Sequence, residues 1–171
     1  MIAFGHTAVG AIVGVTAYHY LGSGNPATGL IITGAAGIAA HYLADLIPHG
    51  HFFGNKEFKS KILADIILDL YISIALFLLI FYFRDGLGIK FFYILFAIGG
   101  SQLPDVIDGL IYIGLLPKTG LLRFEHKLHL LTHWHGIFKD GKLVDGQPIS
   151  PRDIWQLIVV ASSLFLVFYI R

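Results

Sequence analysis

Long runs of apolar residues dominate the chain, and short polar stretches separate them. Five apolar segments stand out, at about residues 2–21, 27–48, 62–83, 89–116 and 153–170. Each is near the roughly 20 residues that a helix needs to cross the hydrocarbon core of a bilayer. Because backbone polar groups find no partner in lipid, each segment is expected to be helical. The pattern predicts an all-α integral membrane bundle that forms one domain over residues 1–171.

Two stretches depart from the simple apolar pattern. The fourth segment contains GGSQLPD at 99–105, and Pro104 is expected to kink or stop the helix there. Residues 105–116 would then form a short re-entrant or interfacial piece. Residues 117–152 are the only long polar segment: LLRFEHKLHLLTHWHGIF predicts an amphipathic helix on the cytoplasmic side, and DGKLVDGQP predicts a turn-rich loop.

Small residues recur at positions where neighbouring helices should touch. They let helix backbones approach closely in lipid, and their expected role is packing alone. The positions are Gly5, Gly10 and Gly14 in the first segment, and Gly29, Thr33 and Gly37 in the second.

Composition agrees with a membrane protein. Only 13% of the residues are charged, whereas a soluble domain carries about a quarter. The chain has no cysteine, which excludes disulfides, thiolate metal sites and a cysteine nucleophile. The net charge of +1 gives no reason to expect nucleic acid as a partner.

Lysine and arginine positions predict the orientation. If the chain crosses the membrane five times, nine of these residues fall on the side of the N-terminus. The other side receives Arg84, Lys90 and Arg171. Positive charge concentrates on the cytoplasmic side of membrane proteins. The N-terminus is therefore expected in the cytoplasm and the C-terminus outside.

The same five-crossing arrangement brings thirteen histidines and aspartates to the cytoplasmic face, and His19 is the only histidine on the opposite side. Ionisable groups at membrane depth are costly and mark functional sites. The converging residues are His6, His41, Asp45, His49, His51, Asp65, Asp69, Asp105, Asp108, His126, His129, His133 and His135.

The spacing of these residues indicates metal binding. His41 and Asp45 are four residues apart, as are His129 and His133. Residues at this spacing share one helix face and can bind one ion together. Imidazole and carboxylate ligands suit zinc, manganese or iron, and this many carboxylates predicts two or more ions. Such a centre could activate a water molecule, with surplus aspartates as bridging ligand, general base or partner of a ligating histidine.

Three short motifs carry a resemblance to a known family. HTAVG (6–10), LPDVID (103–108) and HLLTH (129–133) resemble segments of membrane-bound metal-dependent hydrolases of the LexA-regulated bacterial inner-membrane type. The resemblance implies a prokaryotic inner membrane and metal-ligand roles for the residues His6, Asp105, Asp108, His129 and His133. A weaker likeness is to helical zinc phospholipases C, in which H-x-x-x-D pairs such as His41 and Asp45 bind zinc. It motivates a lipid or phosphoester substrate.

Taken together, these patterns predict a membrane-embedded hydrolase that acts by metal-activated water at the cytoplasmic face. The predicted metal ligands are His6, His41, Asp45, Asp65, Asp105, His129 and His133, with His49, His51, His126 and His135 as possible additions. Asp69 and Asp108 are the predicted catalytic residues. Membrane lipids are the expected partners, and the oligomeric state is open. Two alternatives remain: a metal- or proton-coupled transporter, and a di-iron membrane oxidase or desaturase-like enzyme.

Overall fold

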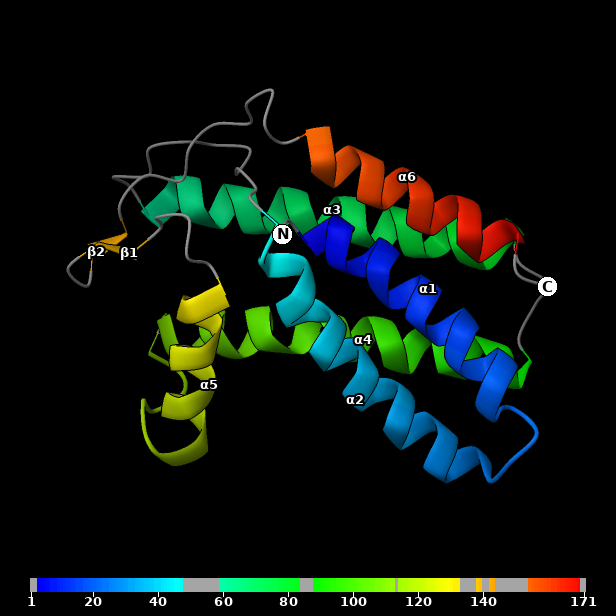
Figure 1. Ribbon diagram of the computed structural model, residues 1–171. Helices are drawn as coiled ribbons and strands as arrows, with labels where there is room; N and C mark the ends of the chain where they lie inside the picture. Colours follow the sequence, from blue (N-terminus) through cyan, green and yellow to red (C-terminus); the bar gives the residue numbers. More distant parts are fainter. Residues whose placement is uncertain are drawn as a thin grey trace.

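The fold is almost entirely helical, so the predicted all-α class is confirmed. The computed structural model describes residues 3–47, 59–83, 88–112, 114–132, 138–139, 142–143 and 154–169. Their elements, drawn in Figure 1, are α1 (Ala3–Leu21), α2 (Pro26–Asp45), α3 (Lys59–Phe83), α4 (Ile89–Tyr112), α5 (Gly120–Thr132), β1 (Phe138–Lys139), β2 (Lys142–Leu143) and α6 (Ile154–Tyr169).

The small hairpin was not predicted from the sequence. Strands β1 and β2 pair antiparallel, with Phe138 opposite Leu143. Strand β2 falls in the predicted turn-rich loop, whereas β1 begins at Phe138, the last residue of the predicted amphipathic helix. The Asp-Gly pair between the two strands in the sequence is a common hairpin signal, and it could have identified this element.

Helix α1 is the centre of the bundle. It contacts α2, α3, α4 and α6. These five helices alternate in direction along the bundle, so one end gathers the starts of α1, α3 and α6 and the ends of α2 and α4 (Figure 1). Helix α5 lies against α2 and α4 at that end. The arrangement brings segments that are distant in sequence to one end of the molecule.

Glycines allow α4 to lie close to both α1 and α2. A Cβ atom added to Gly14 would lie 2.5 Å from the Cα of Ile94, and one added to Gly10 would lie 2.8 Å from the Cα of Ile98. On α2, a Cβ on Gly37 would overlap the carbonyl oxygen of Ala97. The predicted packing role of these small residues is confirmed.

We expect Gly37→Ala to destabilise the bundle. The added methyl group would meet α4 backbone, which cannot move aside as a side chain can, and overpacking of this kind costs about 1–3 kcal/mol. Thermal unfolding in detergent, followed by circular dichroism, measures the change. Gly99→Ala is the matched control because a Cβ there meets nothing within 4 Å. Equal stability of the two variants would contradict the close contact between α2 and α4.

The predicted stop of the fourth helix at Pro104 is wrong, whereas the kink given as the other outcome stays a prediction. Helix α4 continues through Pro104 to Tyr112. A proline removes one backbone hydrogen bond and crowds the preceding turn, but neighbouring helices can satisfy the carbonyl groups of that turn. Pro104 has no N–H for the carbonyl of Gly100, four residues before it. One residue further on, the carbonyl of Ser101 accepts a hydrogen bond from Nδ1 of His41 on α2. Helix α2 therefore contacts the turn that the proline crowds.

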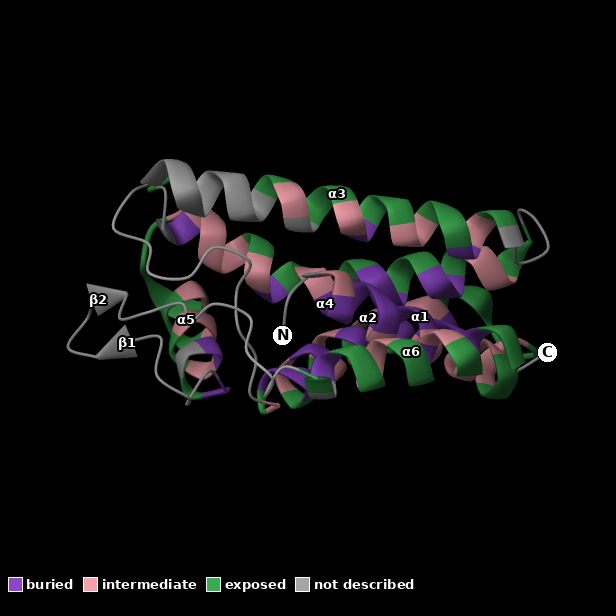
Figure 2. Cartoon of the chain, turned by 90° about the horizontal axis from the view of Figure 1, so that it is seen from above, coloured by how far each residue is buried: buried purple, intermediate pink, exposed green. Residues whose placement is uncertain are grey.

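Two described helices are long and apolar enough to cross a membrane. They are α2, over Pro26–Asp45, and the part of α4 over Ile89–Ile111. Figure 2 places the buried positions mainly where α1, α2 and α4 meet, whereas the outer faces of α3 and α6 are largely exposed. An apolar core of Ala11, Val15, Ile80, Ile94, Ile98 and Val167 joins α1, α3, α4 and α6.

Candidate metal centre

Three helices deliver four possible metal ligands to one point. His6 comes from the first turns of α1, His41 and Asp45 from the end of α2, and Asp105 from α4 directly after Pro104. One ligand atom from each of the four residues lies within 4.8 Å of the others. The group can hold a metal ion.

The distances between these atoms match those of ligands that share one ion. Nε2 of His6 lies 3.1 Å from Oδ1 of Asp45 and 3.7 Å from Oδ2 of Asp105. Nε2 of His41 lies 3.0 Å from Oδ2 of Asp45 and 3.9 Å from Oδ1 of Asp105. Ligands placed tetrahedrally at zinc's usual bond length are separated by about 3.3 Å. The four side chains therefore surround a space of the size that one ion requires.

A backbone hydrogen bond fixes the tautomer of His41. Its Nδ1 lies 2.8 Å from the carbonyl oxygen of Ser101. Because a carbonyl only accepts, Nδ1 must carry the proton, and in the neutral ring Nε2 keeps its lone pair. Metal-binding histidines commonly donate their other ring nitrogen to a carbonyl or carboxylate in this way. The lone pair of His41 thus lies on the side of Asp45.

The hydroxyl of Ser101 is not available as a nucleophile. It is buried and donates to the carbonyl oxygen of His6 at 2.9 Å. Ser101 therefore connects α4 to α1 through its side chain and to α2 through its backbone. This agrees with metal-activated water, not a serine, as the expected nucleophile.

His6 has the strongest need for a partner in the centre. It is fully buried, and neither ring nitrogen makes a hydrogen bond to the residues that the structure describes. Its ring stacks on that of His41, with centroids 4.1 Å apart. A buried polar group without a hydrogen bond costs about 1–3 kcal/mol. A cation bound by Nε2 would remove that cost.

The charges also suit a cation. Asp45 is fully buried, and the side chain of Asp105 is 33% exposed. Taking a carboxylate out of water costs several kcal/mol unless an opposite charge compensates it. His6 and His41 cannot supply that charge while their Nε2 atoms keep the lone pairs that a metal ion needs. A divalent ion would neutralise both.

Helix α5 adds a third histidine. Gly114, with φ of +81°, ends α4 in the left-handed conformation that glycine adopts easily, and the chain then turns into α5. Nε2 of His129 lies 3.4 Å from Oδ1 of Asp105 and 3.6 Å from Oδ2 of Asp45. Burial opposes charge on this ring, but Glu125, Asp105, Asp45 and Asp108 outweigh it and raise the pKa of His129. The local field therefore favours positive charge beside the centre.

No protein-family model, curated protein or solved structure matches this chain. The resemblance to membrane-bound metal-dependent hydrolases thus stays a prediction from three motifs. Functional inference has to rest on the site itself.

Sequence reasoning missed Glu125. Its Oε1 accepts a hydrogen bond of 3.3 Å from the hydroxyl of Tyr42 on α2. The same atom lies 3.8 Å from Nδ1 of His129. The signal was present, because Glu125 precedes His129 by four residues and so shares its helix face. Glu125 is placed to orient the His129 ring and to hold α5 against α2.

We expect Glu125→Gln to weaken metal binding by about 10- to 100-fold, the usual cost of losing a partner that orients a metal-ligating histidine. Metal affinity, measured by competition with a chromophoric chelator, tests this. Lys127→Gln on the exposed side of the same helix is the control. If both variants bind metal alike, Glu125 does not act through His129.

Asp108 and His126 form a separate pair beside the centre. Nδ1 of His126 is hydrogen-bonded to Oδ1 of Asp108, and both side chains are partly buried. Asp108 follows Asp105 by three residues on α4, and His126 precedes His129 by three on α5. The pair therefore lies about one turn, roughly 4.5 Å of helix rise, from the contact between Asp105 and His129. The structure places Asp108 with His126 and not among the four grouped ligand residues.

For the remaining predicted residues, the structure describes no side chain. Asp65 and Asp69 belong to α3, but their side chains are not described. The prediction of a second ion, which relied partly on them, stays a prediction. His49, His51, His133 and His135 lie outside the described residues.

Proposed function

We propose that this chain is a membrane-embedded, metal-dependent hydrolase with its centre at the cytoplasmic end of a five-helix membrane bundle. The observation that carries the proposal is the meeting of buried imidazole nitrogens with the buried carboxylate of Asp45. His6 and His41 both direct Nε2 to this carboxylate, at 3.1 and 3.0 Å. In the described part of the chain, neither Nε2 has a hydrogen-bond partner.

Exposed apolar surface supports the membrane placement. An apolar helix in the core of a soluble protein is mostly buried. In α2 and in α4, however, only 28% of the 18-residue apolar stretch that could lie in a membrane is buried. Ile31 and Leu43 on α2 are 70% and 67% exposed. Exposed patches of this kind mark contact with a membrane or another protein. Helices α1, α3 and α6 run alongside and would complete the five crossings.

The donor set fits zinc first, with manganese or iron as alternatives, because it combines imidazole with carboxylate and the chain has no thiolate. His6, His41, Asp45 and Asp105 would hold the ion, with His129 as a further ligand. When bound, such an ion supplies Lewis acidity and lowers the pKa of a coordinated water. Asp45 and the stacked histidines keep the centre dry on its inner side, and Asp105 is on its more open side.

The pair formed by Asp108 and His126 is the proposed group for proton transfer. Asp108 holds Nδ1 of His126, which leaves Nε2 of the ring to take or give a proton. The carboxylate also stabilises the imidazolium that forms when the ring takes a proton. Because the pair is one turn from the centre, it can serve a substrate bound there without being a ligand.

The position of the centre favours hydrolysis over transport. A transporter needs ionisable groups at the midplane or along both halves of the crossing. In the described parts of α1, α2, α4 and α6, imidazoles and carboxylates lie near one end, except His19. The oxidase or desaturase alternative relies on boxes that include two adjacent histidines, and the sequence contains no adjacent histidine pair.

The depth of the centre supports a lipid or phosphoester substrate. The ligands sit at the end of α2, near the start of α1 and about two turns before the end of α4. If these helices span the bilayer, the ligands lie close to the level of the lipid headgroups. An ester or phosphoester bond at the head of a lipid would reach this level without leaving the membrane. We therefore favour a lipid substrate with a polar, scissile headgroup.

Metal removal tests the proposal. The detergent-purified protein should contain at least one zinc, manganese or iron ion per chain by mass spectrometry. Hydrolysis of bis(p-nitrophenyl) phosphate, or of a fluorescent phospholipid in mixed micelles, should disappear after chelation and return with zinc or manganese. Protein that stays metal-free after incubation with these ions would reject the metal centre. Bound metal without hydrolysis of either substrate would contradict the proposed hydrolase activity.

A further inference from the structure

Helix α5 has two different faces, and only one of them is explained by the metal centre. The inner face carries Glu125, His126 and His129, which contact Tyr42, Asp108 and the centre. The outer face carries Leu121, Phe124 and Leu131, which are 80%, 62% and 71% exposed. At helical spacing these three residues form one stripe, because positions three and seven apart share a face. Nothing in the described part of the chain covers this stripe.

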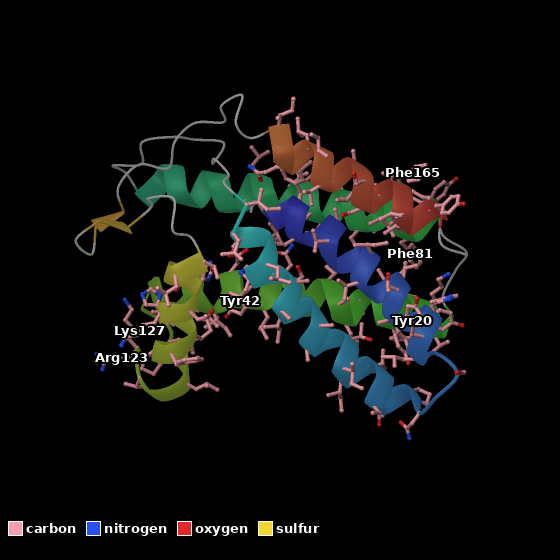
Figure 3. All side chains as sticks on the ribbon, viewed as in Figure 1. Tyr20, Tyr42, Phe81, Arg123, Lys127 and Phe165 are labelled. Carbon is pink, nitrogen blue, oxygen red and sulfur yellow. The ribbon has the colours of Figure 1, made fainter. Side chains whose placement is uncertain are left out.

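The charges of α5 are divided in the same way. Arg123 and Lys127 are exposed and point away from the bundle (Figure 3), and Lys118 is exposed just before the helix. The one acidic residue of α5, Glu125, faces α2. The outer side of the helix is therefore apolar along one stripe and purely cationic beside it. Leucine and phenylalanine on one face with lysine and arginine next to it are typical of helices that lie in a membrane interface.

The place of α5 in the bundle fits that role. It packs against α2 and α4 at the end where both helices finish. If α2 and α4 span the bilayer, α5 lies at headgroup level. Cations at this level are attracted to the anionic lipids of a cytoplasmic leaflet.

We infer that the outer face of α5 binds the anionic headgroup layer, with Leu121, Phe124 and Leu131 inserted among the lipids and Arg123 and Lys127 on their phosphates. This rests on the membrane placement in the proposed function. It adds that the lipid surface holds the helix that supplies His129. A second copy of the chain is a poorer occupant, because like cationic faces would repel one another.

Nitroxide labels can test this, because the chain has no native cysteine. Single labels are attached in the variants Phe124→Cys and Leu131→Cys, and in Ala35→Cys on the exposed side of α2 as the lipid reference. The protein is placed in nanodiscs of phosphatidylcholine alone or mixed with phosphatidylglycerol. Accessibility to oxygen, which concentrates in lipid, is compared with accessibility to a water-soluble nickel chelate.

The expected result is that labels at 124 and 131 favour oxygen, as the label at 35 does. Phosphatidylglycerol should shift them further toward oxygen, and Arg123→Gln with Lys127→Gln should remove that shift. If the labels at 124 and 131 are more accessible to the nickel chelate while the label at 35 is more accessible to oxygen, the inference about α5 is overturned but the membrane placement stands. If all three favour nickel, the membrane placement fails as well. Low access to both reagents with spin–spin broadening would assign the face to a second copy and overturn the inference.

Discussion

Asp45→Asn should remove the metal from the centre and abolish hydrolysis. Asp45 is the buried carboxylate that both His6 and His41 approach, at 3.1 and 3.0 Å. Asparagine keeps the shape but loses the charge, and its amide can donate a hydrogen bond to a histidine lone pair. The variant therefore favours the metal-free protein while the fold is retained. We expect metal affinity to fall by at least about 100-fold, more than the loss of an outer partner causes.

Metal content by mass spectrometry, beside circular dichroism to verify folding, measures this effect. His19→Asn is the matched control, because His19 is exposed at the far end of α1 and should not affect the centre. A folded Asp45→Asn protein with full metal content would show that the ion, if present, is bound elsewhere. If Asp45→Asn does not fold, His41→Gln is measured in its place. The glutamine amide can still donate to the carbonyl of Ser101. We expect the same loss of metal.

Much of this centre could be predicted from local spacing and chain direction. His41 and Asp45 are one turn apart, and α2 and α4 run opposite to α1, so His6, Asp45 and Asp105 come to one end of the bundle. Five of the seven predicted ligands, His6, His41, Asp45, Asp105 and His129, do lie together in the structure. The order and direction of the apolar helices are thus enough to predict most of the residues at the site.

The rest depended on contacts between distant elements, which periodicity does not encode. Pro104 was expected to kink or stop the helix, but the helix continues past it, with His41 of α2 bonded to the turn before it. Glu125 was missed because its partner Tyr42 lies on another helix. Asp108 was predicted as a catalytic residue, but its hydrogen bond to His126 on α5 was not predicted. The packing of α5 against α2 and α4 decides the partners of Glu125 and Asp108, and the sequence of α5 does not specify it.

His126→Gln should retain the metal but lower kcat by about 10²- to 10⁴-fold, the usual contribution of a general acid or base. Asp108→Asn should cause a smaller loss, because the amide oxygen still accepts from Nδ1 and keeps the tautomer, while the charge that stabilises the imidazolium is gone. The double variant should be no slower than His126→Gln, since Asp108 acts through the ring. Steady-state hydrolysis with metal content measured in parallel checks all three. If His126→Gln loses its metal, His126 is a ligand; if it keeps full activity, another group moves the proton.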